Sequence, residues 1–152
     1  MTICSFALND EPMSTFTINA QRFPAFSGLG NLVNKRRYSC TLDRGPIPPG
    51  RYYIVDRESG GRLGALRDFI RGSDRWFALY ADDGRIDDQT YCESVSRGQF
   101  RLHPKSGSGI SKGCITIERT SDFIFIEAML KAGGKSRIPK TDLLTYGIVT
   151  VK

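Results

Sequence analysis

Turn-forming residues recur along this chain at short intervals and leave little room for long helices between them. The most restrictive stretch is GPIPPG at 45–50, where three prolines and two glycines exclude a regular hydrogen-bonded backbone. Glycine (16 residues) and proline (7 residues) together exceed the roughly 12% that proteins usually contain. The pattern therefore favours short strands joined by turns.

Several segments between these turns carry the aromatic and β-branched residues that strands prefer. We expect strands at 16–20, 37–42 (RYSCTL), 51–56 (RYYIVD), 76–81 (WFALYA) and 146–151 (YGIVTV). FPAFSGLG at 23–30 is expected to form a shaped loop, because it holds two glycines and a proline.

One substantial helix is expected from Ser121 to Ala132, with Ser121 as its N-cap and Gly133-Gly134 as its stop. Many strands and one late helix predict a mainly β fold, either a sandwich or a barrel with a helical addition. No repeat, low-complexity tract or linker interrupts the sequence, so residues 1–152 are expected to form a single domain.

The charge balance favours an anionic partner. Lysine and arginine (22) outnumber aspartate and glutamate (16), which leaves a net charge of +6. The basic residues are scattered, without a zinc-finger or RNP-like pattern, so no nucleic-acid partner is expected. No run approaches the ~20 apolar residues of a membrane span. The N-terminal residues lack the pattern of a signal peptide, so we expect a chain made in the cytoplasm without one. We also expect a monomer.

The four cysteines are widely spaced, at Cys4, Cys40, Cys92 and Cys114, and form no C-x-x-C pair. With a single histidine in the chain, this spacing does not suit a zinc site, and we expect neither a metal nor a cofactor. If one cysteine is a working thiol, the other three can form at most one disulfide. The sequence leaves the pairing open.

Strict alternation marks two strands that carry chemical groups. In QFRLH at 99–103, Phe100 and Leu102 share one face, and His103 lies on the opposite face. In CITIE at 114–118, Cys114 likewise lies opposite the two isoleucines. If both strands bury their apolar sides in one core, His103 and Cys114 point to the same polar side.

This pair suits nucleophilic catalysis. Cys114 would attack a carbonyl while His103 takes the thiol proton and returns it to the leaving group. The backbone N–H groups of Gly113 and Cys114 could hold the developing oxyanion. Lys112 would favour the thiolate, and Ser111 could hydrogen-bond the thiol, the substrate or its own loop. The structural alternatives are a buried apolar cysteine and a surface or capping histidine.

His103 followed by Ser111-Lys112-Gly113-Cys114 resembles the active-site signature of L,D-transpeptidases: a histidine, then Ser or Thr, any residue, Gly and Cys. The similarity is closest to a branch of small L,D-transpeptidase-like toxins delivered by type VI secretion systems. The segments that match this branch are FPAFSG (23–28), GPIPPGRYYIVDR (45–57), WFALY (76–80), IDD (86–88) and RGQFRLHP (97–104).

The resemblance implies an L,D-transpeptidase-like β-sandwich whose one substantial helix follows the cysteine strand. It implies catalytic roles for Cys114 as nucleophile, His103 as base and Ser111 as the small hydroxyl residue, with Gly113 at the oxyanion turn. A backbone carbonyl usually orients the histidine in this family. Typical cell-wall enzymes of the family carry a second histidine where this chain has Lys112, which leaves His103 as the sole base.

The implied substrate is the peptidoglycan tetrapeptide stem. Loss of its terminal D-Ala through a thioester would give L,D-carboxypeptidase activity, exchange for a D-amino acid, or a crosslink. Arg101 and Arg97 are candidate contacts for stem carboxylates, because arginine binds a carboxylate bidentately. Asp87 and Asp88 are interpreted as a turn. The resemblance further implies secretion, action in the periplasm of a target cell, and the secretion machinery and a cognate immunity protein as partners.

Two alternatives remain open from the sequence. One is a cysteine endopeptidase (peptidoglycan amidase) that cuts within the stem, although its cysteine usually precedes its histidine. The other is a non-catalytic cell-wall-binding module on the same scaffold.

Overall fold

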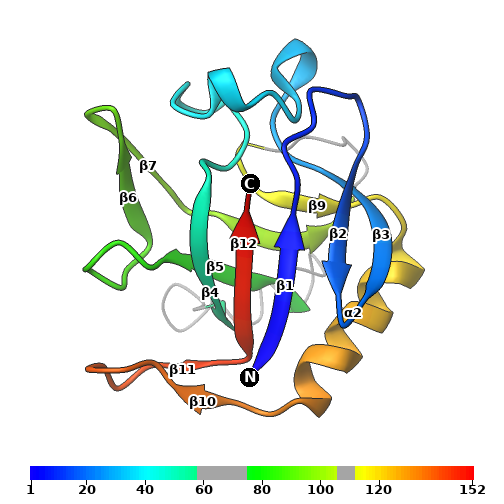
Figure 1. The fold of residues 1–152 in the computed structure, drawn as a ribbon, viewed down its shortest axis with the longest axis vertical. Helices are drawn as coiled ribbons and strands as arrows, with labels where there is room; N and C mark the ends of the chain where they lie inside the picture. The colour runs from blue at the N-terminus through cyan, green and yellow to red at the C-terminus, as the bar shows by residue number, and fades with distance from the viewer. Residues whose placement is uncertain (58–74, 106–111) are drawn as a thin grey trace, which may run out of the picture.

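A closed β-barrel forms the centre of the protein in the computed structural model, which describes residues 1–57, 75–105 and 112–152. In their order around the barrel, the strands are β1 (Thr2–Phe6), β12 (Gly147–Val151), β4 (Gly50–Asp56), β5 (Phe77–Ala81), β8 (Arg101–Pro104), β9 (Ile115–Ile117), β3 (Gln21–Phe26) and β2 (Ser14–Ile18). The first and last strands lie side by side and run parallel (Figure 1).

The mainly β class is confirmed, and of the two architectures that the residue pattern left open the chain forms the barrel, in place of the β-sandwich that the resemblance implied. The difference arises at β1, for which the sequence predicted no strand. β1 pairs with β12 on one side and with β2 on the other, so it joins the two ends of the sheet. Closure removes the unpaired strand edges that a sandwich would keep.

The barrel interior is filled by alternate residues of its strands, as the period of two requires. The strands expected at 51–56, 76–81 and 146–151 are confirmed as β4, β5 and β12, and the one at 16–20 lies close to β2. Fully buried side chains from these and neighbouring strands form one cluster, which includes Phe6, Phe16, Ile54, Leu79, Leu102 and Ile115.

Helix α2 (Thr120–Ala132) confirms the expected helix. It begins one residue before Ser121, with Arg119 in the N-cap position, and Gly133 caps its end as predicted. Its buried residues recur at helical spacing: Phe123, Ile126, Glu127 and Leu130. The helix contacts β8 and β9, and its apolar side chains join the barrel core, so it supports the two strands that carry His103 and Cys114.

Two expectations about the first third of the chain are wrong. Segment 37–42 is a turn and not a strand: the 3₁₀ helix η2 (Arg36–Tyr38) leads into further turns, with hydrogen bonds from Thr41 N to Tyr38 O and from Gly45 N to Thr41 O. Residues 23–26 belong to β3 and not to a loop, and the expected loop begins only at Ser27, before the 3₁₀ helix η1 (Gly30–Leu32).

Two small hairpins project from the barrel (Figure 1). One pairs β6 (Gln89–Cys92) with β7 (Val95–Gly98), and the other pairs β10 (Ser136–Arg137) with β11 (Leu144–Thr145). A disulfide between Cys40 and Cys92 ties the first hairpin to the turn after η2. Among the helices in the described ranges, none has the length and apolar character needed to span a membrane.

The burial of β8 predicts a difference between two leucines. Leu102 is 0% exposed and Leu144 is 47% exposed. Leu102→Ala should lower the free energy of unfolding by about 2–5 kcal/mol, because it leaves a cavity in the barrel. Leu144→Ala, the matched control, should lower it by less than about 1 kcal/mol. Urea unfolding measures both, and equal losses would contradict the placement of β8 in the core.

Candidate active site

His103 and Cys114 line one pocket of about 340 Å³ at the ends of β8 and β9. The remaining lining residues are Asp43, Arg57, Trp76, Gly98, Gln99, Arg101 and Lys112. A larger hollow of about 490 Å³ on β1, β2 and β12 is lined by Cys4, but burial raises the pKa of that thiol to about 12. The pocket around His103 is therefore the candidate active site.

The parallel pairing of β8 with β9 brings the two groups together. Leu102 lies beside Ile115, and His103 lies beside Thr116. Leu102 and Ile115 are both fully buried, so Cys114 and His103, one residue before and after this pair, project to the opposite face. The structure thus agrees with the common polar side that the sequence predicted.

The imidazole of His103 is held from two sides. Its Nδ1 lies 2.7 Å from the carbonyl oxygen of Pro104. A carbonyl can only accept a hydrogen bond, so Nδ1 carries the proton and Nε2 keeps a lone pair. The ring stacks on Trp76, with centroids 4.3 Å apart and planes inclined by 21°. These two contacts fix the orientation of the imidazole, and the Pro104 carbonyl lies where the resemblance implied a backbone carbonyl beside the histidine.

The pocket keeps His103 uncharged. Burial lowers the pKa of the imidazole, and the nearby positive charge of Arg57 lowers it further, while the hydrogen bond to Pro104 acts in the opposite direction. Arg57 lies over the Trp76 ring, 5.5 Å from its centroid, on the residue that stacks against His103. The result is a neutral imidazole at pH 7, able to accept a proton.

The thiol of Cys114 is also neutral in the resting protein. Burial raises its pKa, whereas the backbone N–H and the charge of Arg101 lower it. The charge of Arg57 lowers the thiol pKa as well. The sequence predicted that Lys112 would favour the thiolate, but the cations with the largest effects are these two arginines. The thiol lies 3.9 Å from the carbonyl oxygen of Gln99, to which it can donate.

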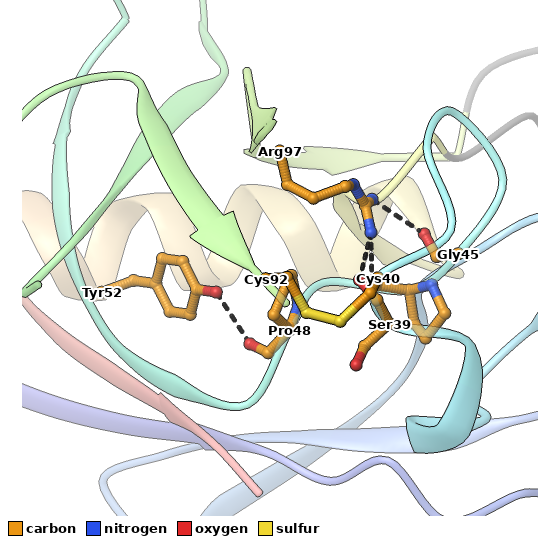
Figure 2. Close-up of a disulfide and its surroundings, with 8 residues drawn as sticks. Ser39, Cys40, Gly45, Pro48, Tyr52, Cys92 and Arg97 are labelled. Carbon is orange, nitrogen blue, oxygen red and sulfur yellow. Dashed lines mark hydrogen bonds between the residues drawn. A yellow bond between two sulfur atoms is a disulfide. The ribbon is translucent and has the colours of Figure 1, made fainter. Parts of the chain in front are cut away.

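Cys114 is not part of the disulfide, which joins Cys40 to Cys92 with their Cα atoms 5.2 Å apart. A disulfide to Cys114 would have excluded nucleophilic chemistry, so this pairing leaves the catalytic interpretation in place. Figure 2 shows the disulfide beside Arg97 and the loop that follows Ser39.

Gly113 precedes the thiol in a backbone conformation that favours glycine, with φ at +102°. A Cβ atom at this position would lie 2.5 Å from a guanidinium nitrogen of Arg97 and 2.8 Å from the Phe100 ring. The backbone conformation and these contacts therefore favour glycine in the turn before Cys114. Ser111 lies outside the described residues.

The two arginines proposed as substrate contacts have different environments. Arg101 lines the pocket, and Asp88 holds its guanidinium with two hydrogen bonds of 2.8 Å. Asp88 thus has a structural role, in accord with its interpretation as part of a turn. Arg97 is 2% exposed and does not line the pocket. Its guanidinium donates to backbone carbonyls, so the structure corrects its role from substrate contact to internal support.

Sequence reasoning missed the roles that three residues play in or next to the site. Trp76 stacks on His103, Arg57 lowers the pKa of both reacting groups, and Asp88 holds Arg101. The sequence marked these residues only in that each lies in one of the segments that carry the family resemblance. Arg75, the residue before Trp76, forms an ion pair with the buried Glu127 of α2, which anchors the chain next to Trp76.

A family model described as the Tlde1 domain matches residues 21–141, which is most of the chain and includes every described lining residue of the pocket. No curated protein and no solved structure shows significant similarity to the chain.

The environment of His103 predicts its titration. In the folded protein its pKa should lie below the ordinary value of about 6.5, and Trp76→Ala should raise it toward that value by exposing the ring. Because this is the only histidine, one imidazole resonance followed by NMR from pH 4 to 8 reports it without overlap. Arg57→Gln should also raise the pKa. A wild-type pKa above 6.5 would contradict the neutral base.

Proposed function

Because the chain belongs to the Tlde1-domain family of type VI secretion effectors, we propose that it is an antibacterial cysteine L,D-carboxypeptidase and L,D-transpeptidase acting on peptidoglycan tetrapeptide stems. The observation that carries the proposal is the β8–β9 pair, which puts His103 and Cys114 on one face of the barrel and into one pocket. The hydrogen bond of His103 to Pro104 supports the same role, because it leaves Nε2 as the basic atom.

The first step is attack on the carbonyl that joins the third stem residue to the terminal D-Ala. The Nε2 atom of His103 takes the proton from the Cys114 thiol as the sulfur bonds to the carbonyl carbon. Negative charge moves to the carbonyl oxygen, where the N–H groups of Gly113 and Cys114 stabilise it. The tetrahedral intermediate then re-forms its carbonyl, and the C–N bond breaks.

The second half releases products. His103 returns its proton to the departing D-Ala nitrogen, which leaves a thioester on Cys114. Water, activated by the same imidazole, gives the tripeptide stem and a regenerated thiol. A D-amino acid gives an exchanged stem, and the side-chain amine of another stem gives a crosslink. Because both reacting groups rest neutral, charge separates only as the reaction proceeds.

Positive charge in the pocket supports an anionic substrate. Among the described residues, Arg57, Arg101 and Lys112 line the site with one carboxylate, that of Asp43, while Asp88 pairs with Arg101. Stem peptides carry several carboxylates, and Arg101 is the candidate to bind one, with Asp88 fixing the orientation of its guanidinium. In this proposal the chain acts in the periplasm of the target cell, and an immunity protein protects the producer.

The proposal predicts the products from purified disaccharide-tetrapeptide. Mass spectrometry should show loss of one D-Ala, or its replacement when D-methionine is added. His103→Gln should lower the rate by about 10²–10⁴-fold, because the base is lost. Cys114→Ala should abolish the reaction, whereas Cys4→Ala, the matched control on the other reduced cysteine, should keep it.

Other outcomes distinguish the alternatives. Cleavage elsewhere in the stem, dependent on Cys114, would indicate an endopeptidase. An unchanged substrate with a folded protein would point to a binding module.

A further inference from the structure

Arg97, in β7, is a buried cation bonded to a loop that is distant in sequence. Its guanidinium donates to the carbonyl oxygens of Ser39, Gly45 (3.1 Å) and Pro46 (3.3 Å), as Figure 2 shows for part of the set. The loop suits this role, because Pro46 has no N–H and a Cβ at Gly45 would lie 1.9 Å from the Tyr38 oxygen. The turn is therefore compact, with its carbonyls aimed at the arginine.

The other side of Arg97 supports the turn before the nucleophile. One guanidinium nitrogen lies 2.5 Å from where a Cβ of Gly113 would be, so the turn lies directly against the arginine. The guanidinium also lies over the Phe100 ring, 5.3 Å from its centroid. The same ring would lie 2.8 Å from a Cβ atom at Gly113. Arg97 and Phe100 therefore both pack against the backbone of Gly113.

The disulfide connects the loop that accepts the hydrogen bonds of Arg97 to the hairpin that carries Arg97. Cys40 follows Ser39, and Cys92 lies in β6, the strand paired with β7. The covalent bond and the hydrogen bonds of Arg97 therefore join the same loop to the same hairpin. A two-stranded hairpin outside a larger sheet is marginally stable on its own, so these links to the loop matter for its position.

We infer that Arg97 is a positioning residue for the oxyanion turn at Gly113, and that the Cys40–Cys92 disulfide sets it in place, so that turnover depends on this bond. The inference rests on the proposed function. Bond formation converts two thiols to a disulfide and passes two electrons and two protons to a disulfide oxidant, such as an oxidising thioredoxin-like protein. The cytoplasm keeps thiols reduced and the bacterial envelope oxidises them. The enzyme would thus gain full activity only after export.

The first test compares three samples of full-length protein on disaccharide-tetrapeptide: oxidised wild type, wild type reduced and then freed of reductant without air, and Cys40→Ser/Cys92→Ser. Removing the reductant matters because a free thiol would itself attack the thioester. The reduced sample and the double variant should lose at least about tenfold in kcat with little change in KM, since the oxyanion forms only in the transition state. Oxidation with glutathione disulfide, followed by removal of all glutathione, should restore the reduced wild type but not the double variant.

The second test keeps the disulfide and changes the arginine. Arg97→Lys retains the charge but cannot reach three carbonyls, so its oxidised form should lose kcat on the same scale. Arg137→Lys, at a site where the side chain is 71% exposed, is the matched control and should leave kcat unchanged. If the disulfide acts through Arg97, reduction should lower the kcat of Arg97→Lys far less than that of wild type.

The outcomes separate the two hypotheses. Oxidised wild type without activity would refute the proposed function itself. Active oxidised wild type whose kcat survives reduction, with a native near-ultraviolet spectrum, would overturn the inference. Oxidised Arg97→Lys with wild-type kcat would overturn it as well, even if the reduced chain unfolds.

Discussion

The parallel pairing of β8 with β9 determines the geometry of the site. Its register is set by Leu102, Ile115 and Ile117, which are all fully buried. A slip of one residue would turn these apolar side chains out of the barrel interior and point the reacting groups into it, so core packing opposes the slip strongly. Helix α2 packs its apolar face against the same two strands. The position of the histidine relative to the cysteine is thus a consequence of the hydrophobic core.

Burial and positive charge then decide the chemistry of this pair. Burial raises the pKa of the Cys114 thiol and lowers that of the His103 imidazole, so it widens the gap between them. Arg57 lowers both pKa values, which assists the thiolate but disfavours the imidazolium. The resting site is therefore a neutral base beside a neutral thiol. In the proposed mechanism, proton transfer therefore accompanies attack on the substrate, and the proposed oxyanion turn at Gly113 stabilises the charge that develops.

Local patterns predicted strands β8 and β9, because alternation of apolar residues and the placing of turn residues depend on only a few neighbouring positions. They predicted the shared face of His103 and Cys114 and the helix ending at Gly133. They failed where the partner is remote: Arg97 bonds to carbonyls 51 to 58 residues away, and Cys40 bonds to Cys92 across 52 residues. Barrel closure depends on β1 meeting β12, which no local pattern reports.

The most direct test of the central claim is to trap the acyl-enzyme. Oxidised protein is mixed with excess disaccharide-tetrapeptide, quenched in acid within the first turnover and digested for mass spectrometry. The proposed mechanism predicts one disaccharide-tripeptide acyl group on the peptide that contains Cys114, together with a burst of D-Ala equal to the enzyme present. An acyl group on another residue, or D-Ala release without a burst while Cys114 keeps its native mass, would contradict Cys114 as the nucleophile.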